Sequence, residues 1–218
     1  MNFEQLDILA QKYMMHRKSH KEREMGAAYF HCKRVSQSVT ILREKLFPQN
    51  GDWDDVLRCA GLFHDIGKGL EPHNHSGAVL VRDLLKHEMT AAELDKVCVL
   101  IEAHTDRQPG TDIHTDCEKL LQDADLLDHY GSQGIWMSCI YYAYMGQKEM
   151  AQVPAFYFSE WQEQVEKHRQ ALNYEISKAI FDEKIQFEQM VARRMESEGK
   201  GNYIGKEFAD ENAIYNMV

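Results

Sequence analysis

The chain has 218 residues, of which 44% are hydrophobic and 28% are charged, and its formal net charge is −10. This acidic balance argues against a protein that holds long nucleic acid, because affinity for the phosphate backbone needs a basic surface. The longest apolar stretch, at 135–145, is interrupted by Ser138 and is too short to cross a bilayer, so we expect no membrane partner.

Helices are expected along the whole chain, since there are only 4 prolines and strand-like alternation persists nowhere. In chain order they fall at 3–18, 24–46, 52–66, 74–86, 90–104, 115–129, 134–146, 159–172 and 175–197. Thr90-x-x-Glu93 and Thr115-x-x-Glu118 are capping boxes that open two of them. Without a linker or a shift in composition, the sequence predicts an all-α fold with one helical domain over 1–198 and a polar tail over 199–218.

Two features indicate the compartment. The first residues, MNFEQLDILAQ, lack the basic segment and apolar run of a signal peptide. The 5 cysteines are an odd number, are widely spaced and form no CxxC pair, which is typical of reduced, buried thiols. We therefore expect a cytoplasmic protein.

Histidines and aspartates interrupt the apolar faces of four predicted helices. They are His31, His64 with Asp65 at the edge of the same face, His104, and Asp125. A buried imidazole without a partner costs about 1–3 kcal/mol, and a buried carboxylate costs more. A divalent cation binds both kinds of side chain, and facing helices can supply its ligands. The pattern therefore predicts a buried metal centre.

The order of these residues resembles the HD-domain superfamily of metal-dependent phosphohydrolases. The matching segments are YFHCKRV around His31, LFHDIGKG around His64 and Asp65, IEAHTD around His104, and LLQDADLLDHYG around Asp125. The resemblance spans roughly residues 25–131, and the segment from Asn173 to Glu198 looks like the closing helix of small bacterial HD proteins that hydrolyse nucleotides. It implies a single HD-type helical bundle around the metal centre.

The resemblance also implies which residues bind metal. The ligands of one divalent ion (Mn²⁺, Fe²⁺, Mg²⁺ or similar) would be His31, His64, Asp65 and Asp125. A second ion, bridged by Asp65, would be held by His75 and His104. One or two ions would activate the attacking water.

Two positions in this set have competitors. His73 competes with His75, but we expect Asn74 to cap the following helix, which makes His75 its first residue. Asp123 competes with Asp125. Asp125 is favoured because it is the aspartate of the ADxL element and flanks the apolar stripe of its helix.

The leading functional hypothesis is an enzyme that hydrolyses small phosphorylated metabolites, most plausibly nucleotides, with Asp65 and Lys68 in the catalytic site. Lys68 follows the HD pair and is the favoured cation for substrate phosphate, and Arg34 and Arg107 are weaker candidates. Two alternatives stay open: an HD-type di-iron oxygenase acting on an inositol or a phosphonate, and a non-catalytic ligand sensor. The substrate, the native metal, the number of ions and the oligomeric state also stay open.

Other aromatic and imidazole side chains have simpler expected roles. Trp53, Trp136 and Trp161 are expected in the core. The histidines at helix ends or on polar faces, including His129 and His168, are expected at the surface.

Overall fold

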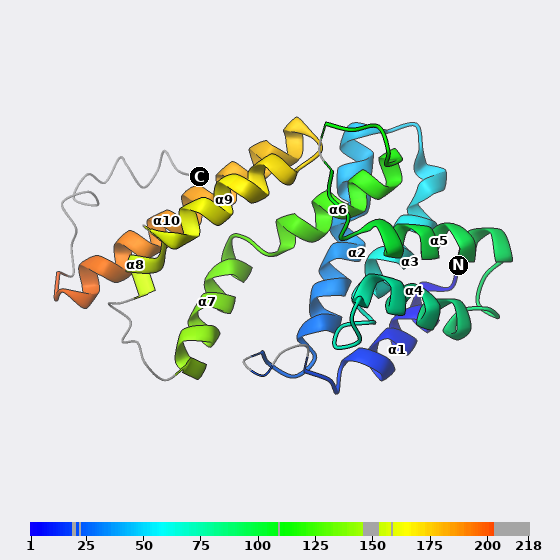
Figure 1. Ribbon diagram of the computed structural model, residues 1–218, viewed down its shortest axis with the longest axis horizontal. Helices are drawn as coiled ribbons and strands as arrows, with labels where there is room; N and C mark the ends of the chain where they lie inside the picture. Colours follow the sequence, from blue (N-terminus) through cyan, green and yellow to red (C-terminus); the bar gives the residue numbers. More distant parts are fainter. Residues whose placement is uncertain (19–20, 22, 109, 146–152, 158, 203–218) are drawn as a thin grey trace.

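A computed structural model describes residues 1–18, 21, 23–108, 110–145, 153–157 and 159–202. Within these ranges every regular element is a helix (Figure 1), so the predicted all-α class is confirmed. The elements are α1 (Phe3–Met14), α2 (Ala27–Leu46), a 3-10 turn η1 (Gly51–Trp53), α3 (Asp54–Phe63), α4 (His73–Leu84), α5 (Ala91–Ala103), α6 (Asp116–Asp128), α7 (Ser132–Met145), α8 (Val153–Tyr157), α9 (Glu160–Ala171) and α10 (Glu175–Gly199).

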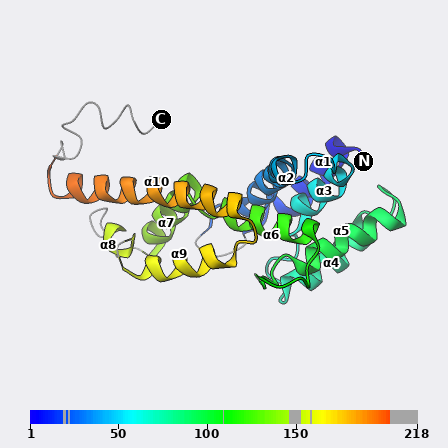
Figure 2. The same ribbon diagram turned by 90° about the horizontal axis from the view of Figure 1, so that it is seen from above.

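The helices form two groups. Helices α1 to α6 make a bundle in which α2 packs against α3 and α6, and α4 packs against α5. Helices α7 to α10 extend from it as an arm, which both ribbon views show on one side of the bundle (Figures 1 and 2). Helix α10 touches α6, α7, α8 and α9, so it connects the arm to the bundle. Buried residues such as Phe63 in α3 and Phe181 in α10 belong to one hydrophobic core.

Both predicted capping boxes are present. Thr90 opens α5 and Thr115 opens α6, and each side chain accepts a hydrogen bond from the backbone of the glutamate three residues later. The glutamate side chain returns the bond, so two backbone donors of the first turn are satisfied at each helix start. These caps set where α5 and α6 begin, and thereby which of their residues face the interior.

Several helix ends differ from the prediction. Helix α3 ends at Phe63 rather than Ile66, and a series of turns follows it. The Arg17 guanidinium donates to the backbone oxygens of Ile66 and Lys68 at 3.1 and 2.6 Å, which holds these turns against the chain after α1. The short helix α8 was not predicted. The boundary at 198 stays a prediction, and residues 203–218 of the predicted tail lie outside the described ones.

The start of α4 corrects a further prediction. Its N-cap is Pro72, so the helix begins at His73, two residues earlier than an Asn74 cap would place it. The Asn74 amide instead donates to the backbone oxygen of Glu102 at 2.7 Å. The Asn74 side chain therefore makes a long-range hydrogen bond to α5 instead of the local cap expected from the sequence.

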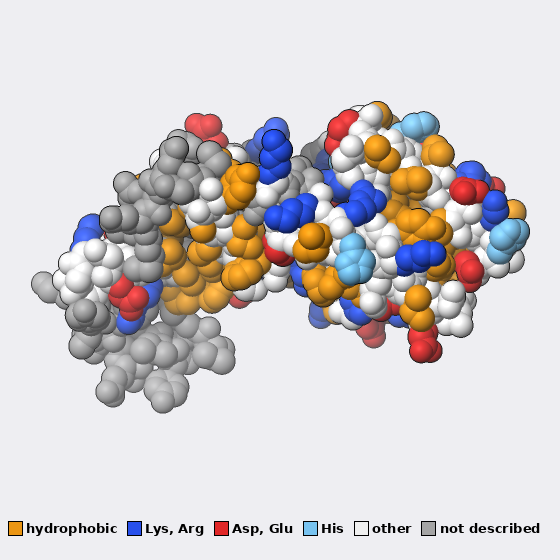
Figure 3. All heavy atoms as spheres, turned by 90° about the horizontal axis from the view of Figure 1, so that it is seen from below, with side chains coloured by type: hydrophobic (Ala, Val, Ile, Leu, Met, Phe, Trp, Pro, Cys, Tyr) orange, Lys and Arg blue, Asp and Glu red, His pale blue; other side chains and the backbone are white. Residues whose placement is uncertain are grey.

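Helix α7 is less covered than its composition predicts. Trp136, which was expected in the core, is 53% exposed, and Tyr141 and Tyr144 on the same helix are also exposed. Hydrophobic side chains gather on the face of the arm seen in Figure 3. Trp161 of α9 is buried as expected. Among the described residues, no helix combines the length and hydrophobicity needed to cross a membrane.

Gly67 allows the turns after α3 to lie directly against α4. A Cβ at this position would come within 2.1 Å of the His73 carbonyl oxygen and 2.6 Å of the Gly77 nitrogen. Both atoms are backbone, so neither can move without shifting the start of α4.

We predict that Gly67→Ala lowers the free energy of unfolding by about 1–3 kcal/mol or more, because the added methyl group overlaps backbone atoms. The matched control is Gly51→Ala, where an added Cβ meets nothing within 4 Å. Urea denaturation followed by circular dichroism measures both variants. Equal midpoints for the two variants would contradict the close approach.

Candidate metal centre

Five buried side chains from four parts of the bundle converge on one point. His31 comes from α2, His64 and Asp65 from the turns after α3, His104 from the end of α5, and Asp125 from α6. The half-buried ring of His73, at the start of α4, joins them. The geometry therefore brings together most of the ligands that the sequence predicted.

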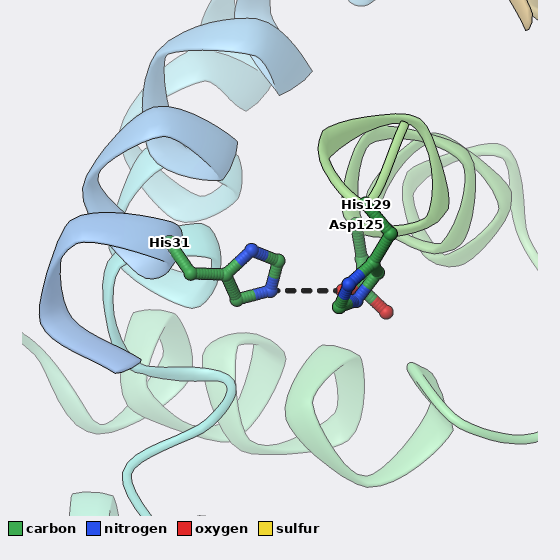
Figure 4. Close-up of side chains that lie close together, drawn as sticks. All are labelled: His31, Asp125 and His129. Atoms are coloured by element: carbon green, nitrogen blue, oxygen red, sulfur yellow. Dashed lines mark hydrogen bonds and ion pairs between the residues drawn. The ribbon is translucent and has the colours of Figure 1, made fainter. Parts of the chain in front are cut away.

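The first half of the cluster is built around His31. Its Nε2 atom lies 3.1 Å from the Nε2 atom of His64 and 3.1 Å from Oδ1 of Asp125. Oδ2 of Asp65 lies 3.9 Å from each of the two imidazole nitrogens. Figure 4 shows His31 reaching from its helix towards Asp125, with His129 beside that carboxylate. Two nitrogens and two carboxylate oxygens thus surround a common point.

The second half uses the other oxygen of Asp65. Its Oδ1 atom lies 3.5 Å from Nε2 of His73 and 3.6 Å from Nε2 of His104. One carboxylate therefore faces two imidazoles through each of its oxygens. This is the arrangement expected of a ligand that bridges two ions.

The protonation of the rings follows from their outer contacts. Nδ1 of His64 donates to the Gly61 carbonyl at 2.9 Å, and Nδ1 of His104 donates to the Ile101 carbonyl at 2.6 Å. A carbonyl can only accept, so in the neutral ring the Nε2 atom carries the lone pair. Nδ1 of His31 donates in the same way to Asp128 at 2.8 Å. Such outer contacts orient metal-binding histidines.

The two helix ends explain how the rings are placed. His64 and His104 are the residues immediately after α3 and α5, and each bonds the carbonyl three residues earlier. The last carbonyls of a helix have no partner within it, so an imidazole at the C-cap can satisfy one. The same local arrangement thus aims two Nε2 atoms inward.

The cluster attracts positive charge. Burial lowers the pKa of His31, but the carboxylates of Asp125 and Asp128 raise it to about 9 overall. Burial would raise the pKa of Asp65, but His64, His104 and Lys68 hold it well below its ordinary value. Neutral Nε2 lone pairs 3.1 Å apart repel each other unless a cation lies between them. A divalent ion satisfies these lone pairs and the carboxylates together, so the residues fit a metal.

The structure favours His73 where the sequence favoured His75. The His75 side chain is 66% exposed, and its Nδ1 atom lies 3.3 Å from Glu102, outside the cluster. Because α4 begins at His73 rather than after Asn74, it is the His73 ring that faces Asp65. The expectation for His75 was therefore based on a helix start that the protein does not have.

Asp123 and Asp125 lie on different sides of α6, and Asp125 lies in the cluster. The Asp123 carboxylate accepts hydrogen bonds from the backbone nitrogens of Asn173 and Tyr174 at 2.9 and 3.2 Å. It thereby fixes the start of α10. Asp125, two residues later, points to the other side of α6 and joins the cluster.

Sequence reasoning missed two residues beside the ligands. His129, expected at the surface, has its Nε2 atom 3.5 Å from Asp125 and its ring centroid 4.9 Å from that of His31. Asp128 holds both His31 and Arg34. The available signal was helical spacing, because residues three and four positions after Asp125 lie on the same face.

A cavity of about 430 Å³ leads from the cluster to the arm. Asp65, His104 and Asp125 line it on the bundle side, and Trp161 and Glu188 line it on the arm side. A smaller cavity of about 70 Å³ reaches the cluster along α2. Most of the candidate ligands therefore border one of the two cavities, whereas His64 lines neither.

The three cations proposed from sequence lie around these cavities. Lys68 lines both, with its Nζ atom 3.4 Å from Asp65 Oδ1 and 3.4 Å from His73 Nε2. Arg107 lines the larger cavity and contacts Asp125, while its buried Nε atom has no hydrogen-bond partner among the described residues. Arg34 lines the smaller cavity, and Asp128 binds it through two bonds of 2.8 Å.

Comparison with known proteins identifies a family. The family model "HD domain" matches residues 28–130. An HD-superfamily hydrolase from Bacillus thuringiensis has a TM-score of 0.63 at 22% identity, covering 90% of this chain and 96% of that one. Bacillus subtilis YpgQ in complex with ADP has a TM-score of 0.60 at 20% identity, covering 89% and 96%. At these identities the likeness shows a shared fold. No curated protein matches the chain.

We predict that His73→Ala lowers metal content while His75→Ala does not, because His73 alone of the two faces Asp65. Both variants remove an imidazole from the first turn of α4, so each controls for the other. The measurement is Mn²⁺ bound per chain after dialysis, by elemental analysis, with the affinity from calorimetry. A loss confined to His75→Ala would show that the sequence-based choice was correct.

Proposed function

The chain belongs to the HD-domain superfamily through residues 28–130, and on that basis we propose that it hydrolyses phosphate bonds of nucleotides with the help of one or two divalent ions. The observation that carries the proposal is the position of Asp65. Its two oxygens face two pairs of imidazoles, and Lys68 lies beside it in the cavity. A site that fits metal cations and has an ammonium group at its edge suits a phosphorylated substrate.

The proposed ligands follow the two halves of the cluster. His31, His64, Asp65 and Asp125 would hold one ion, and Asp65, His73 and His104 would hold the other. Bound divalent ions polarise phosphoryl oxygens and lower the pKa of water. The Nδ1 contacts described above keep the Nε2 atoms available for this role, and Asp128 fixes His31 through its carboxylate.

The cations of the chain would bind the phosphate groups. Lys68 is placed between the two cavities, and the unpartnered Nε atom of Arg107 offers a second donor. Two nitrogens of Arg34 already donate to Asp128, so Arg34 would contribute less to phosphate binding. Among the three, Lys68 would therefore contact the reacting phosphate most directly.

The cavity supports a substrate of nucleotide size. Its volume of about 430 Å³ falls within the usual range for small-molecule sites, which is about 300–1,000 Å³. Leu126, Met137 and Trp161 supply apolar walls away from the charged cluster. The ADP bound to YpgQ, which shares this fold, also supports a nucleotide.

We predict that the wild-type protein with added Mn²⁺ releases phosphate or pyrophosphate from a nucleotide panel, and that Asp65→Ala lowers turnover by at least about a hundredfold because the central ligand is removed. Asp83→Ala, which removes an exposed carboxylate from α4, is the control and should retain activity. Colorimetric phosphate and coupled pyrophosphate assays measure both products.

The alternatives give different results in the same preparation. Retained iron with oxygen consumption on a phosphonate or an inositol, and no phosphate release, would support the di-iron oxygenase. Nucleotide binding without turnover under any metal would support a ligand sensor. Either result would overturn the phosphohydrolase proposal.

We also predict that Lys68→Ala lowers kcat/KM by about tenfold to a hundredfold, the effect expected when a hydrogen bond to a charged group is lost. Lys86→Ala, at an exposed lysine of the loop after α4, should leave the kinetics unchanged. Steady-state kinetics on the best substrate decide the matter. Equal kinetics for wild type and Lys68→Ala would remove Lys68 from the site.

A further inference from the structure

Glu188 is a buried carboxylate in the cavity, on the arm and outside the metal cluster. It lies on α10, is 1% exposed and lines the large cavity. Oε1 accepts a hydrogen bond from the backbone N–H of Gly131 at 2.5 Å. Oε2 is buried and has no hydrogen-bond partner among the described residues. Among the described residues, one oxygen therefore accepts a single hydrogen bond and the other accepts none.

The protein accommodates this carboxylate at a cost. Burial raises the pKa of Glu188 to about 7, although the Gly131 N–H and Lys184 act in the opposite direction. Gly134, in the first turn of α7, leaves room for it, since a Cβ there would lie 2.4 Å from Oε1. A glycine inside a helix costs about 0.5–1 kcal/mol relative to alanine. The burial of the carboxylate and the glycine inside α7 are thus both unfavourable, and both serve to accommodate Glu188.

Anchoring of α10 accounts for only one of the two carboxylate oxygens of Glu188. The bond from Gly131 to Oε1 ties α10 to the turn between α6 and α7, and Lys184 adds a bond to the backbone oxygen of Tyr130 at 3.1 Å. A neutral glutamine would accept the Gly131 N–H equally well. Neither the charge nor the second oxygen is needed for this anchor, so Oε2 is left to accept from a ligand.

The surroundings of Glu188 favour a flat, partly apolar ligand. Trp161 and Met137 line the same cavity and can cover the faces of a ring. The hydroxyl of Tyr130 and Nδ1 of His168 are bonded to each other at 2.5 Å, so they satisfy one another. Glu188 adds an acceptor whose Oε2 atom has no partner among the described residues, and above its pKa of about 7 the ionised carboxylate can only accept.

We propose that Glu188 selects guanine nucleotides: Oε2 accepts a hydrogen bond from the N1–H of the base, and Oε1, which has a second lone pair besides the one that accepts the Gly131 N–H, accepts one from the N2 amino group. Guanine presents these two donors side by side. Adenine and cytosine place a ring acceptor next to their amino group, and uracil places carbonyl oxygens beside its N–H, which an ionised carboxylate disfavours. This inference rests on the proposed function, because the metal cluster would hold the phosphates in the same cavity.

The test compares Glu188→Gln with wild type on GTP, ITP and ATP. Wild type should prefer GTP, and ITP, which lacks the N2 amino group, should be a poorer substrate. Glu188→Gln keeps the acceptor for Gly131 but replaces the second oxygen by a donor, so kcat/KM for GTP should fall by about tenfold to a hundredfold. The value for ATP should change by less than about threefold. An equal loss for all three nucleotides would overturn the proposal.

Binding measurements distinguish a failure of base selection from a failure of the proposed hydrolysis. Calorimetry with GDP, IDP and ADP needs no turnover. Preference for GDP that disappears in Glu188→Gln, with no hydrolysis, would support base selection and overturn the phosphohydrolase. Hydrolysis with equal binding of the three diphosphates would overturn base selection and leave the phosphohydrolase standing.

A stability measurement excludes a merely structural role. The pKa of Glu188 is raised from 4.5 to about 7, so its contribution to stability is present at low pH and is lost as the pH rises through about 7. The titratable groups around it are Lys184 on α10, Tyr130 after α6 and His168 on α9, and all three remain in the variant. Glu188→Gln should therefore melt at a higher temperature than wild type at pH 8, with a smaller difference at pH 5. A lower melting temperature at pH 8 would show that the carboxylate is structural and would overturn the inference.

Discussion

The buried carboxylate of Asp65 is the group on which the rest of the site depends. It has imidazole nitrogens on both sides, at 3.9 Å from one oxygen and at 3.5 and 3.6 Å from the other. Removing a carboxylate from water is costly, and only positive charge or hydrogen bonds compensate for it. Every neighbouring ring already uses Nδ1 elsewhere, so the inward-facing atoms are acceptors unless protonated. The geometry that makes the site costly without a cation therefore also makes it fit one.

The helical bundle meets this requirement with local structure. α3 and α5 both end on a histidine that bonds the carbonyl three residues before it, and α2 and α6 bring His31 and Asp125 within 3.1 Å. Gly67 then lets α4 approach closely enough for His73 to reach the other side of Asp65. The ligands come from different helices, but each one is oriented by a contact within its own helix end or with an adjacent helix. Such outer contacts restrict the rotation of the rings.

What could be predicted from the sequence follows from the range of the interactions involved. Helical spacing placed His31, His64, His104 and Asp125 on apolar faces, and the capping boxes located two helix starts. That the His73 ring rather than the His75 ring lies beside Asp65 could not be foreseen, because the Asn74 side chain bonds a carbonyl of α5 instead of capping α4. Glu188 is 57 positions from the backbone N–H that it binds, and no local sequence pattern predicts this contact. Long-range contacts to the arm thus lay beyond sequence reasoning.

The two ends of the cavity differ in the ligand groups that they would bind. At the bundle end, carboxylates and imidazole lone pairs fit a cation, and Lys68 and Arg107 leave donors for an anion. At the arm end, Glu188 requires a donor. A nucleotide that carries a divalent ion on its phosphates and N–H groups on its base supplies each of these in one molecule. An unsatisfied buried polar group costs about 1–3 kcal/mol. These groups are already removed from water in the folded protein, so a ligand that bonds them at both ends gains affinity without desolvating them again. In the proposed function, the arm, joined to the bundle through α10, would contact the base, and the bundle would hold the reacting phosphates.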